Sequence, residues 1–207
     1  MGERRICDQD YTILRPNWTE LHQYFDDIFG KEEGRNFSNN MSKILWGYET
    51  TVGKYNYELL ASYLSNNTNL SFTAKNIQEW DDLVRNMKDT VEPFAREFLE
   101  YNKRTGKSSV ILTNWFGDSQ RERLRRHGLL ELFDEVYSGD VITKPNREAY
   151  MRATGNYPIS NCTIIGDNYE ADYAPPIIIG INAILYDPND SYPKELVKVK
   201  SLSELIK

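Results

Sequence analysis

The sequence is poor in several features, and each shortage excludes a class of protein. Its 2 cysteines, Cys7 and Cys162, form no metal-ligand cluster and fall in expected buried strands, which suits a reducing cytosol. The most apolar run, residues 174–186, is too short to span a bilayer. Basic residues are also few, because 25 Lys and Arg stand against 31 Asp and Glu. The resulting net charge of −6 argues against a nucleic-acid-binding surface.

The start of the chain carries charges with no long apolar run behind them, so we expect no secretory signal. We therefore predict a cytoplasmic protein, monomeric or homodimeric, that binds neither membrane nor nucleic acid. With 207 residues, of which 40% are hydrophobic and 27% charged, the chain can form one globular domain with an insertion.

The most informative stretch is the short apolar segment at residues 4–14, which carries the spacing Asp-x-Asp-x-Thr at Asp8, Asp10 and Thr12. If a strand ends near Asp8, both carboxylates lie just beyond its carboxyl end, where open α/β sheets bind ligands. Neighbouring acids repel each other unless a shared proton or a cation relieves the repulsion. Mg²⁺ suits such a site because it needs few carboxylates and keeps positions open for phosphate oxygens. The stretch therefore predicts a nucleophilic carboxylate, a second acid and a metal.

Residues 17–89 contain no convincing strand, and their apolar positions recur at helical spacing. The spacing predicts helices near residues 18–29, 41–48, 57–63 and 72–87. We expect a helical insertion large enough to bury a small core of its own.

After the insertion, apolar strands alternate with helices, which predicts an α/β fold with a doubly wound parallel sheet. Strands are expected at residues 109–112, 135–137, 162–166, 181–185 and 197–199, and helices at 91–103, 118–126, 144–152 and 202–206. Asp118 or Ser119 is expected to cap the second of these helices. Its arginines, Arg121, Arg123 and Arg125 among them, are expected to form a solvated face.

Polar residues follow the apolar strands. Thr113 and Asn114 come after one strand, Asp167 after another, and Lys144 opens the helix after a short strand. In a parallel sheet these ends share one edge, so the residues should converge. Carboxylates, a hydroxyl, a lysine and free backbone amides suit a phosphate and Mg²⁺ better than an apolar ligand.

With these residues in this order, the chain resembles the haloacid dehalogenase-like (HAD) hydrolases of subfamily I, in which a helical cap is inserted after the first motif. The four motifs appear in order as Asp8-Gln9-Asp10-Tyr11-Thr12, Ile111-Leu112-Thr113-Asn114, Lys144-Pro145 and Gly166-Asp167-Asn168-Tyr169-Glu170-Ala171-Asp172. The resemblance implies a Rossmann-like core formed by residues 1–16 and 90–207 and a helical cap formed by residues 17–89.

The resemblance also implies a division of labour among the acids. Asp8 would be the nucleophile that takes the phosphoryl group. Asp10 would protonate the leaving oxygen and then activate the hydrolytic water. Asp8, the backbone carbonyl of Asp10, and Asp167 would hold Mg²⁺. Asp172 would orient the lysine or a metal-bound water.

The remaining motif residues would bind and position the substrate. Thr113 and the amide of Asn114 would bind phosphate oxygens, and Lys144 would offset the charge that builds up among carboxylates and phosphate. Thr12 would brace the first loop. Tyr11 departs from the residues common at its position, and its ring is expected to narrow the phosphate pocket or to stack on a leaving group.

The predicted function is a magnesium-dependent phosphatase of a small phosphorylated metabolite, working through an aspartyl-phosphate on Asp8. A dehalogenase would lack the acid at Asp10, so phosphate chemistry is favoured. A phosphomutase on the same residues, or a non-catalytic binding protein on the same scaffold, stays an alternative. A sugar phosphate, a phosphoglycolate-like acid and a nucleoside monophosphate all remain open as substrates.

Overall fold

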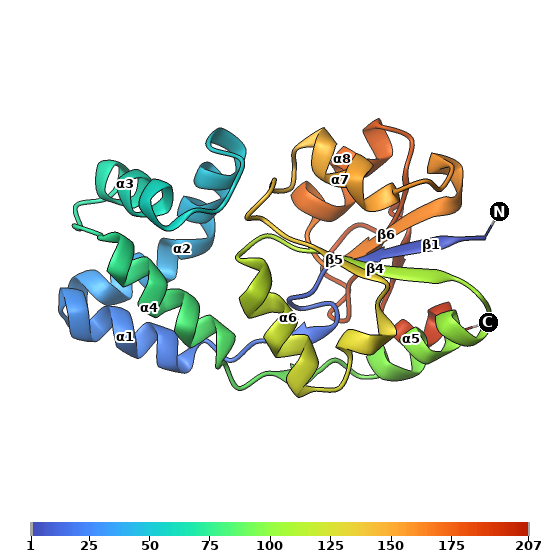
Figure 1. The fold of residues 1–207 in the computed structure, drawn as a ribbon, viewed down its shortest axis with the longest axis horizontal. Helices are drawn as coiled ribbons and strands as arrows, with labels where there is room; N and C mark the ends of the chain where they lie inside the picture. The colour runs from blue at the N-terminus through green and yellow to red at the C-terminus, as the bar shows by residue number, and fades with distance from the viewer. Residues whose placement is uncertain (1, 207) are drawn as a thin grey trace.

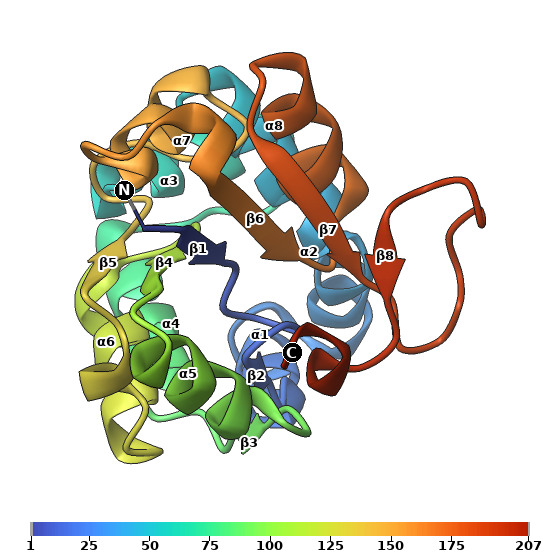
Figure 2. The ribbon, with the colours of Figure 1, turned by 90° about the vertical axis from the view of Figure 1, so that its right-hand side faces the viewer.

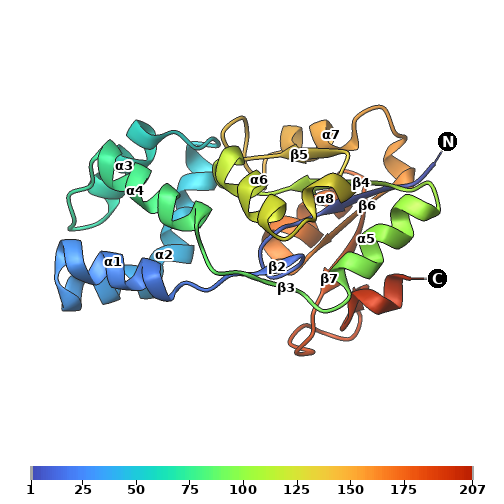
Figure 3. The same ribbon diagram turned by 60° about the horizontal axis from the view of Figure 1, so that its bottom comes forward.

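The computed structural model describes residues 2–206 and consists of a helical unit beside an α/β unit (Figure 1). The helical unit contains α1 (Thr19–Phe29), α2 (Lys31–Thr51), α3 (Tyr57–Asn67) and α4 (Ala74–Arg85). Two short antiparallel strands, β2 (Leu14–Arg15) and β3 (Thr90–Val91), lie where the chain leaves and rejoins the α/β unit (Figure 3). Within residues 2–206, no helix combines the length and apolar character needed to cross a membrane.

The α/β unit is built on one parallel sheet. Its strands are β1 (Arg4–Cys7), β4 (Ser108–Leu112), β5 (Glu135–Tyr137), β6 (Cys162–Gly166), β7 (Asn182–Tyr186) and β8 (Lys198–Val199). They lie in the order β5-β4-β1-β6-β7-β8 (Figure 2), and the prediction of a doubly wound parallel sheet is confirmed. The chain adds strands on one side of β1 and then on the other, so the edge beyond β1 is the topological switch point where such sheets bind ligands.

Alternate residues of the central strands face two separate cores. Cys7, Ile111 and Ile165 are fully buried on one face, under helices such as α5 (Ala95–Arg104) and α6 (Gly117–Arg126). Their neighbours Ile6, Val110 and Ile164 face the other side, under α7 (Arg147–Thr154). The chain is completed by α8 (Ala174–Ile178) and by the short helical turns η1 (Leu130–Leu132), η2 (Ile159–Asn161), η3 (Tyr169–Tyr173) and η4 (Leu202–Leu205).

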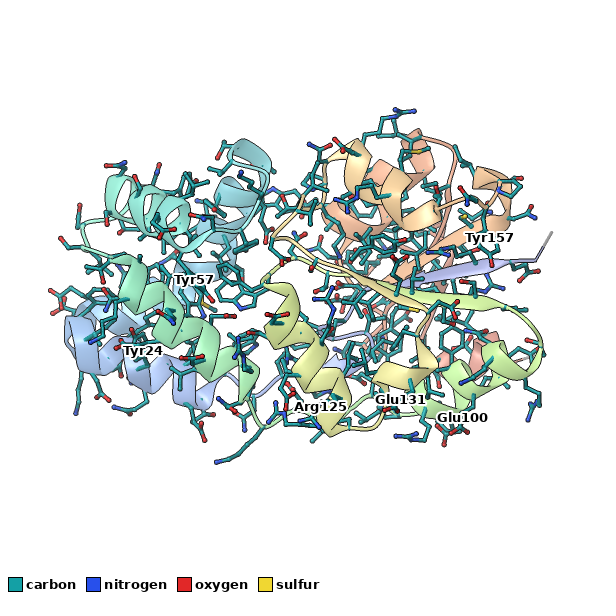
Figure 4. All side chains as sticks on the ribbon, in the orientation of Figure 1. Tyr24, Tyr57, Glu100, Arg125, Glu131 and Tyr157 are labelled. Carbon is teal, nitrogen blue, oxygen red and sulfur yellow. The ribbon has the colours of Figure 1, made fainter. Side chains whose placement is uncertain are left out.

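The helical unit has its own aromatic core, which reaches into the α/β unit. Trp115 and Phe116, from the loop after β4, belong to this core. The Trp115 ring centroid lies 4.9 Å from that of Trp80 in α4. The Phe116 ring centroid lies 4.5 Å from that of Tyr57, which Figure 4 places on the side of the helical unit that faces the sheet. The two units are thus joined by interdigitated rings.

Several helix bounds differ from the prediction. Helix α2 begins at Lys31 instead of near residue 41, because α1 packs closely against its polar first half. A Cβ at Gly34 would lie 2.3 Å from the Phe25 carbonyl oxygen, so only glycine permits this approach. Helix α5 begins at Ala95, since Thr90–Val91 pairs with β2.

Two expected helix starts were also wrong. The residue that precedes α6 is Phe116, and neither Asp118 nor Ser119 caps this helix. Helix α7 begins at Arg147, where the Asn146 side chain accepts a hydrogen bond from the Glu148 amide. Lys144 therefore lies in the loop before the helix, which leaves its side chain free to reach the sheet edge.

Candidate active site

The centre of the site is an ion-pair bridge at the carboxyl edge of the sheet. Lys144 Nζ lies 2.8 Å from Asp8 Oδ1 and 2.6 Å from Asp172 Oδ1. Asp8 directly follows β1, whereas Asp172 belongs to the turn after β6. The exposed fractions of the Lys144, Asp8 and Asp172 side chains are 4%, 14% and 1%. These charges are therefore largely removed from water, and their interaction is strong.

Asp167 joins this bridge to form a group of carboxylates. Oxygen atoms of Asp8, Asp167 and Asp172 all lie within 4.8 Å of one another. Burial raises the pKa of Asp8 to about 7, with Lys144 opposing the rise and Asp172 adding to it. Burial, followed by repulsion from Asp8 and Asp172, raises the pKa of Asp167 to about 8. The single lysine thus leaves negative charge uncompensated, and a hard divalent cation with oxygen ligands fits this donor set.

Lys144 itself stays charged. Burial alone would lower its pKa, but the carboxylates of Asp172 and Asp8 outweigh burial and raise it. Its backbone is fixed as well, because Asn114 Oδ1 accepts a 2.8 Å hydrogen bond from the Lys144 amide. Asn114 Nδ2 also donates to the Lys144 carbonyl oxygen over 3.1 Å. The loop after β4 therefore positions the lysine for the loop after β1.

Thr113 lies next to this group, at the end of β4, and is 2% exposed. Its hydroxyl donates to the Asn114 carbonyl oxygen over 3.0 Å and accepts from Gln120 Nε2 over 2.9 Å. Gln120, on α6, is fully buried and was not among the predicted site residues. Its side-chain amide orients the Thr113 hydroxyl.

Asp10 has a partner that the sequence interpretation got wrong. Arg123 was expected on a solvated face, but its side chain is 0% exposed. The Arg123 guanidinium reaches both oxygens of Asp10, at 2.5 and 3.3 Å, and both oxygens of Asp89, at 2.8 and 2.9 Å. Arg125, two positions further on, is 62% exposed and lies on the outer side of α6 (Figure 4). The expectation of a solvated face therefore fails for Arg123, which is buried, and holds for Arg125.

Two further residues of the first motif, Thr12 and Tyr11, differ in their exposure to solvent. The Thr12 side chain is buried, and among residues 2–206 its hydroxyl has no hydrogen-bond partner. Tyr11 adopts a left-handed backbone conformation with φ 57°, and its side chain is 43% exposed. The Tyr11 hydroxyl accepts a 2.7 Å hydrogen bond from Trp18 Nε1, so it links the first motif to the start of the helical unit.

Most of the motif residues line one cavity between the two units, with a volume of about 370 Å³; Thr12, Gln120 and Arg123 lie outside its lining. The α/β unit supplies Asp8, Asp10, Thr113, Asn114, Lys144, Asp167 and Asp172, and the helical unit supplies Glu49 together with aromatic and aliphatic residues such as Trp46, Trp80 and Leu45. Such a volume lies at the lower end of the range for small-molecule sites. The cavity therefore suits a small molecule held between the carboxylates and the aromatic wall.

Glu49 is another residue of the site that the sequence did not reveal. It lies on α2, and its Oε1 accepts a 2.7 Å hydrogen bond from the Tyr55 hydroxyl. Burial raises its pKa to about 7, while hydrogen bonds from Tyr55 and Asn114 oppose the rise. The only signal in the sequence was a lone acid between Trp46 and Tyr55, which by itself is indistinguishable from an exposed helical position.

Comparison with known proteins finds curated relatives over about half of the chain and solved structures of the same fold. No family model matches the chain. A phosphoserine phosphatase from Thermus thermophilus is 31% identical over 121 residues, which are 55% of this chain and 49% of the relative. The chain spans about half the length of the curated relatives it matches.

Solved structures match almost the whole chain. An L-2-haloacid dehalogenase from Xanthobacter autotrophicus has a TM-score of 0.71 at 14% identity and covers 100% of this chain and 97% of its own. A HAD-hydrolase from Bacillus subtilis, solved with magnesium bound, has a TM-score of 0.68 at 17% identity. The match covers 99% of this chain and 96% of the Bacillus subtilis chain. The resemblance drawn from the four motifs is therefore confirmed in the fold, including the inserted helices.

Proposed function

We propose that this chain, whose fold is that of the HAD hydrolases, is a magnesium-dependent phosphatase of a small phosphorylated metabolite. The observation that carries the proposal is the placement of Asp8 at the switch point, bonded to Lys144 and grouped with Asp167 and Asp172. The Thermus thermophilus relative is also a phosphatase. We propose in addition that residues 1–16 and 90–207 form the catalytic core, that residues 17–89 form a cap, and that the protein acts in the cytoplasm as a monomer or homodimer.

In the proposed reaction an Asp8 oxygen attacks the phosphorus atom of the substrate. The bond from phosphorus to the leaving oxygen breaks, and Asp10 gives that oxygen a proton. Water then attacks the aspartyl-phosphate, Asp10 takes a proton from it, and the bond from Asp8 to phosphorus breaks to release orthophosphate. Lys144 and the Thr113 hydroxyl stabilise the charge on the phosphoryl oxygens.

Asp8, Asp167 and the backbone carbonyl of Asp10 would hold Mg²⁺ in this proposal, with Asp172 orienting Lys144. When bound, the metal neutralises charge between the carboxylates and the phosphate oxygens. The raised pKa values of Asp8 and Asp167 support such a site, because a cation would restore both carboxylates to their ionised form. Asp8 must be ionised to act as a nucleophile.

The dehalogenase reaction is the competing enzymatic function, since one matched structure is a dehalogenase. The carboxyl group of Asp10 lines the cavity and favours the phosphatase, because a leaving alkoxide needs a proton and a leaving halide does not. A phosphomutase would return the phosphoryl group to another hydroxyl instead of releasing orthophosphate. Measurement of free orthophosphate distinguishes these reactions.

The test is release of p-nitrophenol from its phosphate ester, with and without Mg²⁺, in the parent protein and in Asp8→Asn. We expect Mg²⁺-dependent turnover in the parent and a loss of about 10³-fold or more in the variant. A folded parent that neither binds Mg²⁺ nor releases orthophosphate from any ester would refute the proposal. Release of chloride from 2-chloropropionate, with no release of phosphate, would favour the dehalogenase.

A further inference from the structure

The cavity contains an acid that the proposed phosphatase reaction does not use. Glu49 lines the same cavity as Asp8 and Lys144 but comes from α2, in the helical unit. Its hydrogen-bond donors are the uncharged Tyr55 hydroxyl and the Asn114 amide. No Lys, Arg or His within residues 2–206 forms a salt bridge with it.

Among residues 2–206 this carboxylate has no salt-bridge partner of its own, although the charge of Lys144 acts to lower its pKa. Lys144 is the only cationic side chain among the described residues that line the cavity, and it is already shared by Asp8 and Asp172. A largely buried carboxylate with no cation is costly to keep ionised. An occupant that brings a positive charge to Glu49 would remove this cost.

The rest of the wall is suited to the same kind of occupant. All 4 tryptophans of the chain line the cavity, together with two tyrosines; they are Trp18, Trp46, Trp80, Trp115, Tyr11 and Tyr55. Trp80, Trp115 and Tyr55 pack against other rings, whereas Trp18 and Trp46 have no ring partner among the described residues. Aromatic faces attract ammonium groups through the ring quadrupole, most strongly for tryptophan.

Building on the proposed phosphatase function, we propose that Glu49 and the aromatic wall select phosphate esters whose leaving group carries an ammonium cation on a short carbon chain. The phosphate lies at Asp8 and Lys144, and the cation lies at Glu49 and the rings. A volume of about 370 Å³ limits the leaving group to a few carbon atoms. Leaving groups with a second phosphate or a carboxylate are disfavoured, because the described lining offers no second cation to pair with them.

The test compares esters of equal shape that differ in charge. Phosphocholine is paired with 3,3-dimethylbutyl phosphate, its uncharged carbon analogue, and phosphoethanolamine with propyl phosphate. We expect kcat/KM of the parent to favour each charged ester by about 10-fold or more, a size that cation–π and ion-pair contacts can supply. Phosphoserine, which adds a carboxylate, should be hydrolysed less efficiently than phosphoethanolamine.

Two variants test whether the preference for charged esters comes from Glu49. Glu49→Gln keeps the shape and the hydrogen bonds but removes the charge, so the preference should fall by about 10-fold or more, mainly through KM. Glu32→Gln removes the same charge from an exposed position on the same helix and should keep the parental preference. Loss of kcat by the same factor for charged and uncharged esters in Glu49→Gln would instead mean a proton-transfer role and would overturn the proposal.

The outcomes separate this inference from the function on which it rests. Hydrolysis of p-nitrophenyl phosphate with equal efficiency toward charged and uncharged esters would overturn the inference and leave the phosphatase in place. If no ester is hydrolysed, the phosphatase fails and calorimetry decides the inference. Phosphocholine should then bind the parent at least about 10-fold more tightly than 3,3-dimethylbutyl phosphate, and equal affinities would overturn the inference.

Discussion

Asp10 Oδ1 lies 2.5 Å from Arg123 Nη2, and the same nitrogen lies 2.8 Å from Asp89 Oδ1. The arginine thus joins the first motif to the segment that returns from the helical unit just before β3. Its side chain and that of Asp89 are both 0% exposed, whereas that of Asp10 is 26% exposed to the cavity. Arg123 therefore positions a carboxylate that must still reach the substrate.

Replacement of Arg123 by methionine should destabilise the protein by about 3–5 kcal/mol, because it leaves the Asp89 carboxylate buried without its main cation. Denaturant unfolding measures this loss. The double variant Arg123→Met with Asp89→Asn should recover part of it, and strictly additive losses would contradict the pairing. Arg125→Met is the matched control, since that side chain is 62% exposed and should change stability by about 0.5 kcal/mol or less.

Lys144→Met should abolish turnover and also destabilise the fold by about 3–5 kcal/mol, because Asp8 and Asp172 lose their shared cation. Adding Asp172→Asn removes one of the two carboxylate charges that lose their partner in Lys144→Met. The double variant should therefore regain stability without regaining activity. Unfolding curves and p-nitrophenol release, measured on the same samples, check both parts. A double variant less stable than Lys144→Met would show that the bridge is not the source of the loss.

Trp115→Phe should cost about 1–3 kcal/mol of stability. The Trp115 indole donates a 2.8 Å hydrogen bond to Asp81 Oδ1, and Asp81 is 1% exposed. Ser119 and Tyr57 would remain as donors to Asp81, so the loss should stay within the range for one hydrogen bond to a charged group. If Trp115→Phe with Asp81→Asn loses as much as the two single variants combined, the hydrogen bond contributes nothing.

The pH dependence of stability should report on Glu49. Burial raises its pKa to about 7, from 4.5 in the unfolded chain. The protonated side chain therefore contributes stability that is fully present below about pH 4.5 and is lost as the pH rises through about 7. The glutamine of Glu49→Gln is neutral at every pH. The free energy of unfolding of this variant, relative to that of the parent, should therefore rise by roughly 1–3 kcal/mol between about pH 4.5 and pH 8. Urea titrations of both proteins measure this difference in stability. A difference that does not change with pH would refute the raised pKa of Glu49.

The centre of the sheet was predictable because β4 and β6 each contain an apolar run and are buried at every position. The convergence of Asp8, Thr113, Lys144 and Asp167 followed from parallel topology alone, since each comes after a strand. Helix α2 was predicted too short because its first half is polar and contains Gly34. Packing against α1, not local preference, makes that half helical.

The buried partners of the site could not be predicted. Arg123 has the same local sequence context as its exposed neighbours, and only the three-dimensional fold brings Asp10 and Asp89 to it. Glu49 and Gln120 present the same difficulty, because each is a single polar residue on a helix with no motif around it. Ion pairs between distant segments leave no trace in periodicity or spacing.

The rings of Trp115 and Phe116 have a practical consequence for anyone who wishes to exchange the helical insertion. The insertion is not a detachable module, because part of its hydrophobic core is supplied by the loop that also carries Thr113 and Asn114. A transplant that joins only the chain ends at β2 and β3 would leave a hole where these two rings belong. A working chimera must carry the loop after β4 together with the insertion, as one inherited unit.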